Sequence, residues 1–175
     1  MFIAVLVLFL VAGVSMPPAQ AVPAPASPES AQAEAAAQAL LKAFTAGDVP
    51  AMSEHFAEKL LFIGDPQFLG ESRGPQVHRD LTRAELAAAY TKLFDGMGRD
   101  RWTALVKQAT PSVHRATANE SHPEDTAGIL PPDFAKAGDT VCEIRFRGSG
   151  LDDVLLFVLR PIDGKLKVVA HWADY

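Results

Sequence analysis

Asp65 is the residue of this sequence best placed to do chemistry. It follows an apolar stretch, Leu60–Ile63, and precedes Pro66. A carboxylate at the mouth of an apolar pocket can have its pKa raised toward that of a useful general base. An Asp-Pro pair is also typical of an Asx turn, in which the carboxylate accepts a hydrogen bond from the backbone. The sequence leaves both interpretations open, and the turn is the commoner use of such a pair.

Two other side chains could donate hydrogen bonds to a substrate. Tyr90 carries a hydroxyl and Trp172 carries an indole N–H. With Asp65 as the general base, either donor would serve a proton transfer or a dehydration that needs no cofactor. The ordinary alternative for both rings is a place in the hydrophobic core. Both are therefore candidates for a site and for the core.

The patterns of other catalytic and metal sites are missing from the sequence. The five histidines match no recognised spacing of metal ligands, and the chain lacks a nucleophile elbow, a phosphate-binding glycine loop and a paired-cysteine motif. The single cysteine, Cys142, is expected as a buried structural thiol. A formal net charge of −5 argues against nucleic acid as a partner, because such binding needs a basic face. We therefore expect no metal, no cofactor and no nucleic acid.

The N-terminal segment has the features of a signal peptide. Phe2–Val14 is an apolar run too short to span a membrane, although no Lys or Arg precedes it, and Ala19–Ala21 forms an A-x-A cleavage site. The predicted organisation is a signal peptide over 1–21, a Pro/Ala tether over 22–28 and one domain over 29–175. We expect an exported protein, periplasmic or extracellular, with no membrane partner after cleavage.

The elements that would position these groups begin with two helices. Ser27–Glu29 starts a helix that Gly47 ends, with a hydroxyl cap and a proline in its first turn. Asp48 starts a second helix that runs to about Ala57. A short strand over Leu60–Ile63 is predicted to lead to Asp65, and residues 67–80 are predicted to form a polar loop.

A third helix has the clearest start signal of the chain. Thr82 and Glu85 form a capping box, and Leu81 and Leu86 are placed as a hydrophobic staple across it. After this helix, Arg101–Gln108 is predicted to begin a strand.

The last third of the sequence predicts three antiparallel strands, which are Thr140–Arg147, Asp153–Arg160 and Lys165–Asp174. The outer two alternate between apolar and polar residues. The middle one is nearly all apolar, as in a strand covered on both faces or central in a strongly curved sheet. In the last strand the alternation places Trp172 on the apolar face with Val168, and His171 on the opposite face. Asp163-Gly164 predicts a hairpin turn. Residues 112–138 are predicted to form a long polar excursion before the first of these strands.

Helices followed by strands predict an α+β fold, with three N-terminal helices packed on a strongly curved antiparallel sheet. Particular residues stand at the joints of this order: Phe44–Asp48, Met52 with Phe56, Asp65-Pro66, Asp163–Leu166, and His171-Trp172. In these features the chain from about Glu29 to Asp174, apart from the excursion over 112–138, resembles the nuclear transport factor 2-like superfamily, including its SnoaL-like and ketosteroid isomerase-like branches. The resemblance implies a cone-shaped, cystatin-like roll with an open mouth and an apolar interior. It also implies an outer sheet face that could form a homodimer.

Within that resemblance, steroid-isomerase chemistry is disfavoured. Asp65 stands where those enzymes carry a proton-shuttling aspartate in an Asp-Pro pair. Their enolate oxygen also needs a tyrosine and a protonated acid as hydrogen-bond donors. Those two positions fall at or near Leu40 and near Leu156 of this sequence, and leucine donates no hydrogen bond.

We predict a binding protein for a small apolar or amphipathic molecule held inside the cone. Aromatic side chains would line its pocket: Phe44, Phe62, Phe94, Phe146 and Trp172. The first alternative is a cofactor-independent isomerase or dehydratase, with Asp65 as the base and Tyr90 as a donor. The second is a non-catalytic interaction or dimerisation module. An open interior that contains Asp65 would favour a ligand or an enzyme, and a filled interior would favour the interaction module.

Overall fold

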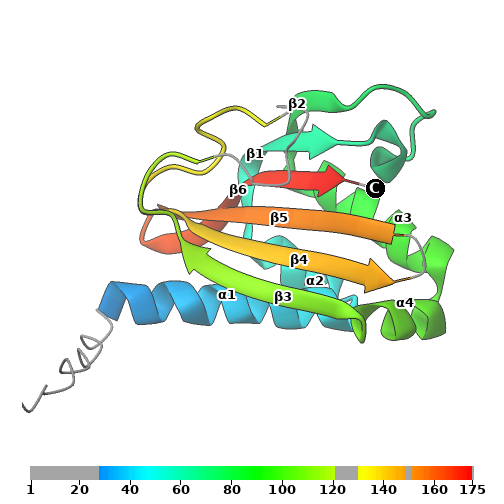
Figure 1. The fold of residues 1–175 in the computed structure, drawn as a ribbon, viewed down its shortest axis with the longest axis horizontal. Coiled ribbons are helices and arrows are strands. Elements are labelled where there is room, and N and C mark those ends of the chain that lie inside the picture. The colour runs from blue at the N-terminus through cyan, green and yellow to red at the C-terminus, as the bar shows by residue number, and fades with distance from the viewer. Residues whose placement is uncertain (1–27, 121–129, 149–150, 175) are drawn as a thin grey trace, which may run out of the picture.

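The structure is a computed structural model that describes residues 28–120, 130–148 and 151–174. The signal peptide predicted over 1–21 and the tether predicted over 22–28 lie outside the described residues, apart from Pro28. Within the described ranges, all strands join one six-stranded sheet in the order β2-β1-β6-β5-β4-β3 (Figure 1). The strands are β1 (Phe56–Gly64), β2 (Val77–Thr82), β3 (Ala109–Arg115), β4 (Thr140–Gly148), β5 (Leu151–Ile162) and β6 (Lys165–Asp174). Neighbouring strands are antiparallel except β1 and β6, which are parallel.

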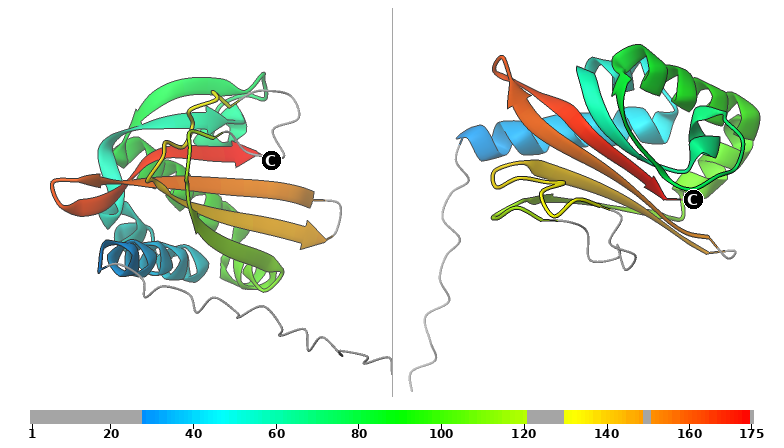
Figure 2. Two further views of the ribbon diagram at one scale, coloured as in Figure 1. Left: turned by 60° about the vertical axis from the view of Figure 1, so that its left-hand side comes forward. Right: turned by 90° about the horizontal axis from the view of Figure 1, so that it is seen from above.

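The helices lie on one side of the curved sheet, as Figure 2 shows. They are α1 (Pro28–Ala46), α2 (Val49–Glu54), α3 (Arg83–Met97) and α4 (Arg99–Val106), with a short 3₁₀ helix, η1 (Pro66–Leu69). Their buried side chains meet those of the sheet in one cluster, which supplies the hydrophobic burial that holds the two layers together. The predicted α+β architecture, with helices packed on a strongly curved sheet, is confirmed.

Buried apolar side chains form two clusters on opposite faces of the sheet. The inner cluster lies between helices and sheet, and its largest fully buried members are Phe44, Phe56, Phe62, Tyr90 and Phe157. The outer cluster lies on the other face: Ile63, Ala116, Leu130, Phe134, Ala135, Val141, Val154, Leu156, Val158, Ala170 and Trp172. Side chains of β5 alternate between the two clusters, so the prediction that this strand is covered on both faces is confirmed.

Local hydrogen-bond signals predicted two joints correctly. The Thr82 hydroxyl accepts a hydrogen bond from the Glu85 backbone N–H at 3.3 Å, and the Glu85 carboxylate accepts one from the Thr82 backbone N–H at 2.7 Å. This reciprocal capping box starts α3 as expected. Between β5 and β6, Asp163 and Gly164 have φ values of 50° and 73°, which are the left-handed values that a tight hairpin turn requires.

Three predicted elements differ in the structure. Arg101–Gln108 was expected to begin a strand, but most of it belongs to α4, in which Trp102 packs against Phe44 with ring centroids 5.0 Å apart. The second helix ends at Glu54 instead of Ala57, because the chain enters β1 at Phe56. The polar loop predicted over 67–80 contains part of η1 and most of β2. The latter is an edge strand in which only Leu81 is buried, so its sequence lacks an apolar alternation.

A β-bulge in β6 changes which side chains face the helices. Val168 pairs with Leu159 and Ala170 pairs with Val158, so Val169 is an extra residue on its strand. Before the bulge Val168 belongs to the inner cluster, and after it Ala170 and Trp172 belong to the outer cluster. The prediction that Trp172 shares a face with Val168 is therefore wrong.

The predicted position of His171 is also wrong, for the same reason. Strict alternation placed this residue on the outer face, but it is fully buried and its ring contacts Tyr90 and Phe157 of the inner cluster. The reason is that one additional residue in a strand inverts the orientation of every side chain that follows it.

The described part of the excursion predicted over 112–138 covers the outer face. Its first residues belong to β3, and after the gap Leu130 and Phe134 pack in the outer cluster with Trp172. Asp139, which is 2% exposed, accepts two hydrogen bonds from Arg160 of β5, at 2.6 and 2.8 Å. This paired, charge-assisted contact anchors the end of the segment to the sheet.

The surroundings of Gly64 and Gly96 predict opposite effects when each is replaced by alanine. A Cβ on Gly64 would lie 2.5 Å from the backbone oxygen of Ala173, which the sheet holds in place, so Gly64→Ala should cost about 1–3 kcal/mol of stability. A Cβ on Gly96 in α3 meets nothing within 4 Å, and Gly96→Ala should stabilise by up to about 1 kcal/mol. Urea unfolding of both variants checks the signs. Equal stability of the Gly64 variant and the parent would contradict the close approach.

Candidate functional site

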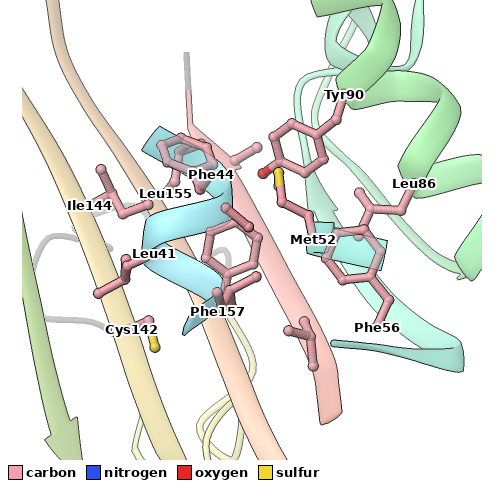
Figure 3. Close-up of a cluster of buried hydrophobic side chains, with 14 of the residues drawn as sticks. Leu41, Phe44, Met52, Phe56, Leu86, Tyr90, Cys142, Ile144, Leu155 and Phe157 are labelled. Atoms are coloured by element: carbon pink, nitrogen blue, oxygen red, sulfur yellow. The ribbon is translucent and has the colours of Figure 1, made fainter. Parts of the chain in front are cut away.

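The space between helices and sheet, which was expected to form an open pocket, is filled by side chains of the inner cluster. Figure 3 shows side chains from α1, α2, α3, β4 and β5 converging there. Phe44, Phe62, Tyr90 and Phe157 are all 0% exposed. The Phe44 ring centroid lies 6.0 Å from that of Tyr90 and 6.0 Å from that of Phe157. Because a side chain that lines a water-sized cavity keeps some accessible surface, these four residues line no such cavity.

The structure brings together four of the five residues predicted to line a pocket. Phe44, Phe62, Phe94 and Phe146 all pack in or against the inner cluster. The Phe44 ring centroid lies 6.2 Å from that of Phe94 and 6.4 Å from that of Phe146. Trp172 is separated from them by the sheet.

Asp65 occupies a turn. It is the N-cap of η1, and its carboxylate oxygen Oδ1 accepts a hydrogen bond from the Gln67 backbone N–H at 2.7 Å. The side chain is half-buried at the end of β1. The Asx-turn interpretation of the Asp65-Pro66 pair is confirmed, and the carboxylate is already engaged by its own backbone.

Tyr90 and His171 form a buried pair that the sequence did not reveal. The Tyr90 hydroxyl lies 2.9 Å from His171 Nε2, and His171 Nδ1 lies 2.8 Å from the Leu156 carbonyl oxygen. A carbonyl oxygen only accepts hydrogen bonds, so Nδ1 carries the proton. In the neutral ring Nε2 must then accept from the tyrosine hydroxyl. The imidazole also stacks on Phe157, with centroids 4.5 Å apart and planes 7° apart.

Burial keeps this imidazole neutral. Desolvation lowers the pKa of His171 from its ordinary value of 6.5 to about 4, although the hydrogen bond to the Leu156 carbonyl opposes the shift. Neither partner is exposed to solvent, since Tyr90 and His171 are both 0% exposed. The pair therefore ties α3 to β6 and β5 across the inner cluster. The one sequence signal for it is the consecutive Val168 and Val169, which interrupts the alternation of β6.

A hollow of about 580 Å³ lies on the opposite face of the sheet. We call it the outer hollow. Its floor is apolar and its rim is charged, and its lining includes Phe134, Val141, Leu156, His114, Glu120, Glu143 and Arg145. The apolar members belong to the outer cluster. The charged members come from β3, β4 and the segment that follows β3.

Two ion pairs form the rim of the outer hollow. Arg145 donates two hydrogen bonds to one Glu143 carboxylate oxygen, at 2.6 and 2.9 Å, and their side chains are only 20% and 16% exposed. His114 Nε2 lies 2.7 Å from Glu120 Oε1. With a neutral histidine, the rim holds two carboxylates and one guanidinium. The outer hollow therefore carries a small excess of negative charge.

The thiol and the possible metal ligands add no chemistry to either face. Burial raises the pKa of Cys142 to about 12, so the prediction of a buried structural thiol is confirmed. Among the residues that the structure describes, no group of three or more His, Cys, Asp or Glu side chains could hold a metal ion. None of the helices in the described ranges is both long and apolar enough to cross a membrane.

No family model and no curated protein matches this chain. It is similar to an NTF2-like protein of unknown function from Methylobacillus flagellatus, with 12% identity, 86% of this chain and 94% of the other covered, and a TM-score of 0.46. A ketosteroid isomerase-like protein from Erwinia carotovora has 16% identity, coverage of 84% and 95%, and a TM-score of 0.40. A domain of unknown function with a cystatin-like fold, from Nostoc punctiforme, has 15% identity, coverage of 80% and 72%, and a TM-score of 0.40. From similarity at this level we infer nothing about activity, ligand or partner.

The buried pair predicts that the protein loses stability in mild acid. Unfolded chains bind a proton on His171 near pH 6.5, whereas the folded protein does so only near pH 4. The contribution of neutral His171 is therefore complete above pH 6.5, and about 3 kcal/mol of it is lost as the pH falls to 4. Denaturant unfolding at a series of pH values measures this loss.

The control is His171→Gln, because an amide can also donate to Leu156 and accept from Tyr90 but does not titrate. Burial also lowers the pKa of His55, which adds a slope of the same sign in both proteins. The difference between the two pH profiles isolates His171. Identical profiles would show that this imidazole is not held neutral by burial.

Proposed function

We propose that this protein is a non-catalytic binding protein that holds a small amphipathic molecule in the outer hollow. The observation that carries the proposal is the combination of an apolar floor and a charged rim in a space of about 580 Å³. Ligand sites of proteins typically enclose about 300–1,000 Å³ and pair an apolar lining with a few polar groups. The filled inner cluster supports a site outside the cone instead of the one expected within it.

The lining of the outer hollow favours one class of ligand. Phe134, Val141 and Leu156 would contact an apolar body. Glu120 and Glu143 on the rim outnumber Arg145, so a neutral or basic head group meets a favourable potential and an acidic one does not. The ligand is therefore proposed to be an amphipathic molecule with a hydrogen-bonding or basic head.

A cofactor-independent isomerase or dehydratase is supported less well. Its proposed base, Asp65, accepts a hydrogen bond within its own turn, and its proposed donor, Tyr90, hydrogen-bonds to His171 within a filled interior. The same filled interior favours an interaction or dimerisation module as the second candidate. A second copy or another protein would then cover the outer face in place of the small molecule.

The test compares two probes with the same alkyl chain, decyltrimethylammonium and decyl sulfate, below their micelle concentrations. We expect the cationic probe to bind about fivefold more tightly, a difference of about 1 kcal/mol. Glu143→Gln should abolish the preference, because the rim then holds one carboxylate, Glu120, and one guanidinium, Arg145. Glu34→Gln removes an exposed carboxylate outside the outer hollow and is the matched control. Calorimetry measures the affinities.

Amide chemical shifts locate the bound probe. Changes at Val141 and Ala135 support the outer hollow, whereas changes confined to Tyr90 and His171 would place the ligand inside the cone and contradict the proposal. Concentration-dependent sedimentation, with no shift on adding either probe, would favour the dimerisation module.

We also propose that the chain is exported, from the apolar run Phe2–Val14 and the cleavage site at Ala19–Ala21. The expected product of expression in a bacterium is a mature chain that begins at Val22. Fractionation followed by intact mass measurement checks both the compartment and the cleavage. Recovery of the uncleaved chain in the cytoplasm would contradict export.

A further inference from the structure

A second hollow, of about 490 Å³, lies where the start of β6 meets three helical segments. We call it the basic hollow. Arg83 comes from the start of α3, Glu54 and His55 from the end of α2, and Lys165 and Lys167 from β6. The side of α1 contributes only uncharged residues to its lining. The basic hollow is separate from the outer hollow, since the two share no lining residue.

The charge of the basic hollow is opposite to that of the whole chain. Arg83, Lys165 and Lys167 face a single carboxylate of the lining, that of Glu54, in a protein with a formal net charge of −5. The Lys167 amino group hydrogen-bonds to the Glu54 backbone carbonyl, which holds this cation at the wall. Three cations held around a concave space attract an anion.

Arg83 has a donor without an acceptor at this place. One terminal nitrogen of its guanidinium lies 2.7 Å from Glu58 Oε1, but its Nε is buried and has no hydrogen-bond partner among the residues that the structure describes. Leaving a buried donor unpaired costs free energy, and the cost is greater for a charged group. The Arg83 guanidinium is therefore incompletely paired in the free protein, beside the basic hollow that it lines.

We propose that the basic hollow binds a small oxyanion, a carboxylate or phosphate group, with its negative charge placed between the Arg83 guanidinium and the lysines of β6. The proposal goes beyond the outer hollow and its amphipathic ligand, and it stands if that site fails. The oxyanion belongs either to a small molecule in solution or to the head group of an acidic lipid, and both present the same chemistry to Arg83.

His55 would report the bound anion. Burial and the charge of Lys167 lower the pKa of His55, while Glu54 raises it. Arg83 and Lys165 are the other charged groups of the lining. A bound anion favours the imidazolium form, so the pKa of His55 rises on binding. By linkage, the anion binds more tightly as the pH falls through the range in which His55 titrates.

The experiment titrates the purified chain with inorganic phosphate at constant ionic strength, following the His55 ring and the Lys167 amide by NMR. Saturable shifts and a rise in the His55 pKa are expected. Lys165→Gln should weaken phosphate binding about fivefold, and Arg83→Lys, which keeps the charge but removes the forked donors of the guanidinium, should weaken it by at least as much. Lys107→Gln removes an exposed lysine outside the basic hollow and should leave the affinity unchanged.

Vesicles that contain phosphatidylglycerol form the second arm. Binding of phosphate without vesicles assigns the site to a soluble anion. Vesicle binding that Arg83→Lys abolishes, and that Lys107→Gln leaves intact, assigns it to a lipid head group. Linear, non-saturating shifts, or an equal loss in the Lys165 and Lys107 variants, would show only general attraction of anions and would overturn the proposal. A failure of the probes for the outer hollow changes none of these outcomes.

Discussion

The arrangement of both faces of the sheet depends on one hydrogen-bonded imidazole. His171 needs a donor and an acceptor to remain buried, and it finds them in the Tyr90 hydroxyl and the Leu156 carbonyl. It reaches them because the additional residue Val169 turns the second half of β6 over. The same shift brings Trp172 to the outer cluster, where described residues beyond β3 cover it. One bulge thus determines which aromatic side chains fill the interior and which form the base of the outer face.

The filled interior explains where binding must occur if this protein binds a ligand. The rings of the inner cluster, together with that of His171, contact one another at centroid distances between 4.5 and 6.4 Å. Phe44, Tyr90 and Phe157 among them are fully buried. Opening a cavity among such rings would forfeit both hydrophobic burial and dispersion contacts. The two hollows described above form instead at places where elements meet with charged residues at their edges. Polar groups there keep contact with water, so a ligand exchanges with solvent without disturbing the inner cluster.

Signals contained within a few residues were read correctly from the sequence. The capping box of Thr82 and Glu85 and the turn at Asp163-Gly164 each depend on neighbouring residues, and both form as predicted. Elements that depend on distant partners were predicted incorrectly. The segment around Trp102 is helical because its ring packs on Phe44, more than fifty residues earlier, and donates to the Thr45 carbonyl. The bulge is defined by the register between β5 and β6, and its one local signal, the consecutive Val168 and Val169, does not show which residue is the additional one. For that reason Asp65 and Tyr90 could be named, but the partner of Tyr90 could not.

The two hollows differ in charge, and the difference argues that they serve different ligands. In the outer hollow every charged side chain has an ionic partner: Arg145 has Glu143, and His114 has Glu120. A ligand there gains mainly from apolar contact, and the small excess of negative charge on the rim adds only a preference for a basic head group. In the basic hollow three cations of the lining outnumber its one carboxylate. An excess of like charge held together destabilises the free protein, so its neutralisation by an oxyanion contributes to stability as well as to binding. An anion in the basic hollow should therefore stabilise the fold directly, whereas occupancy of the outer hollow should leave its ion pairs in place.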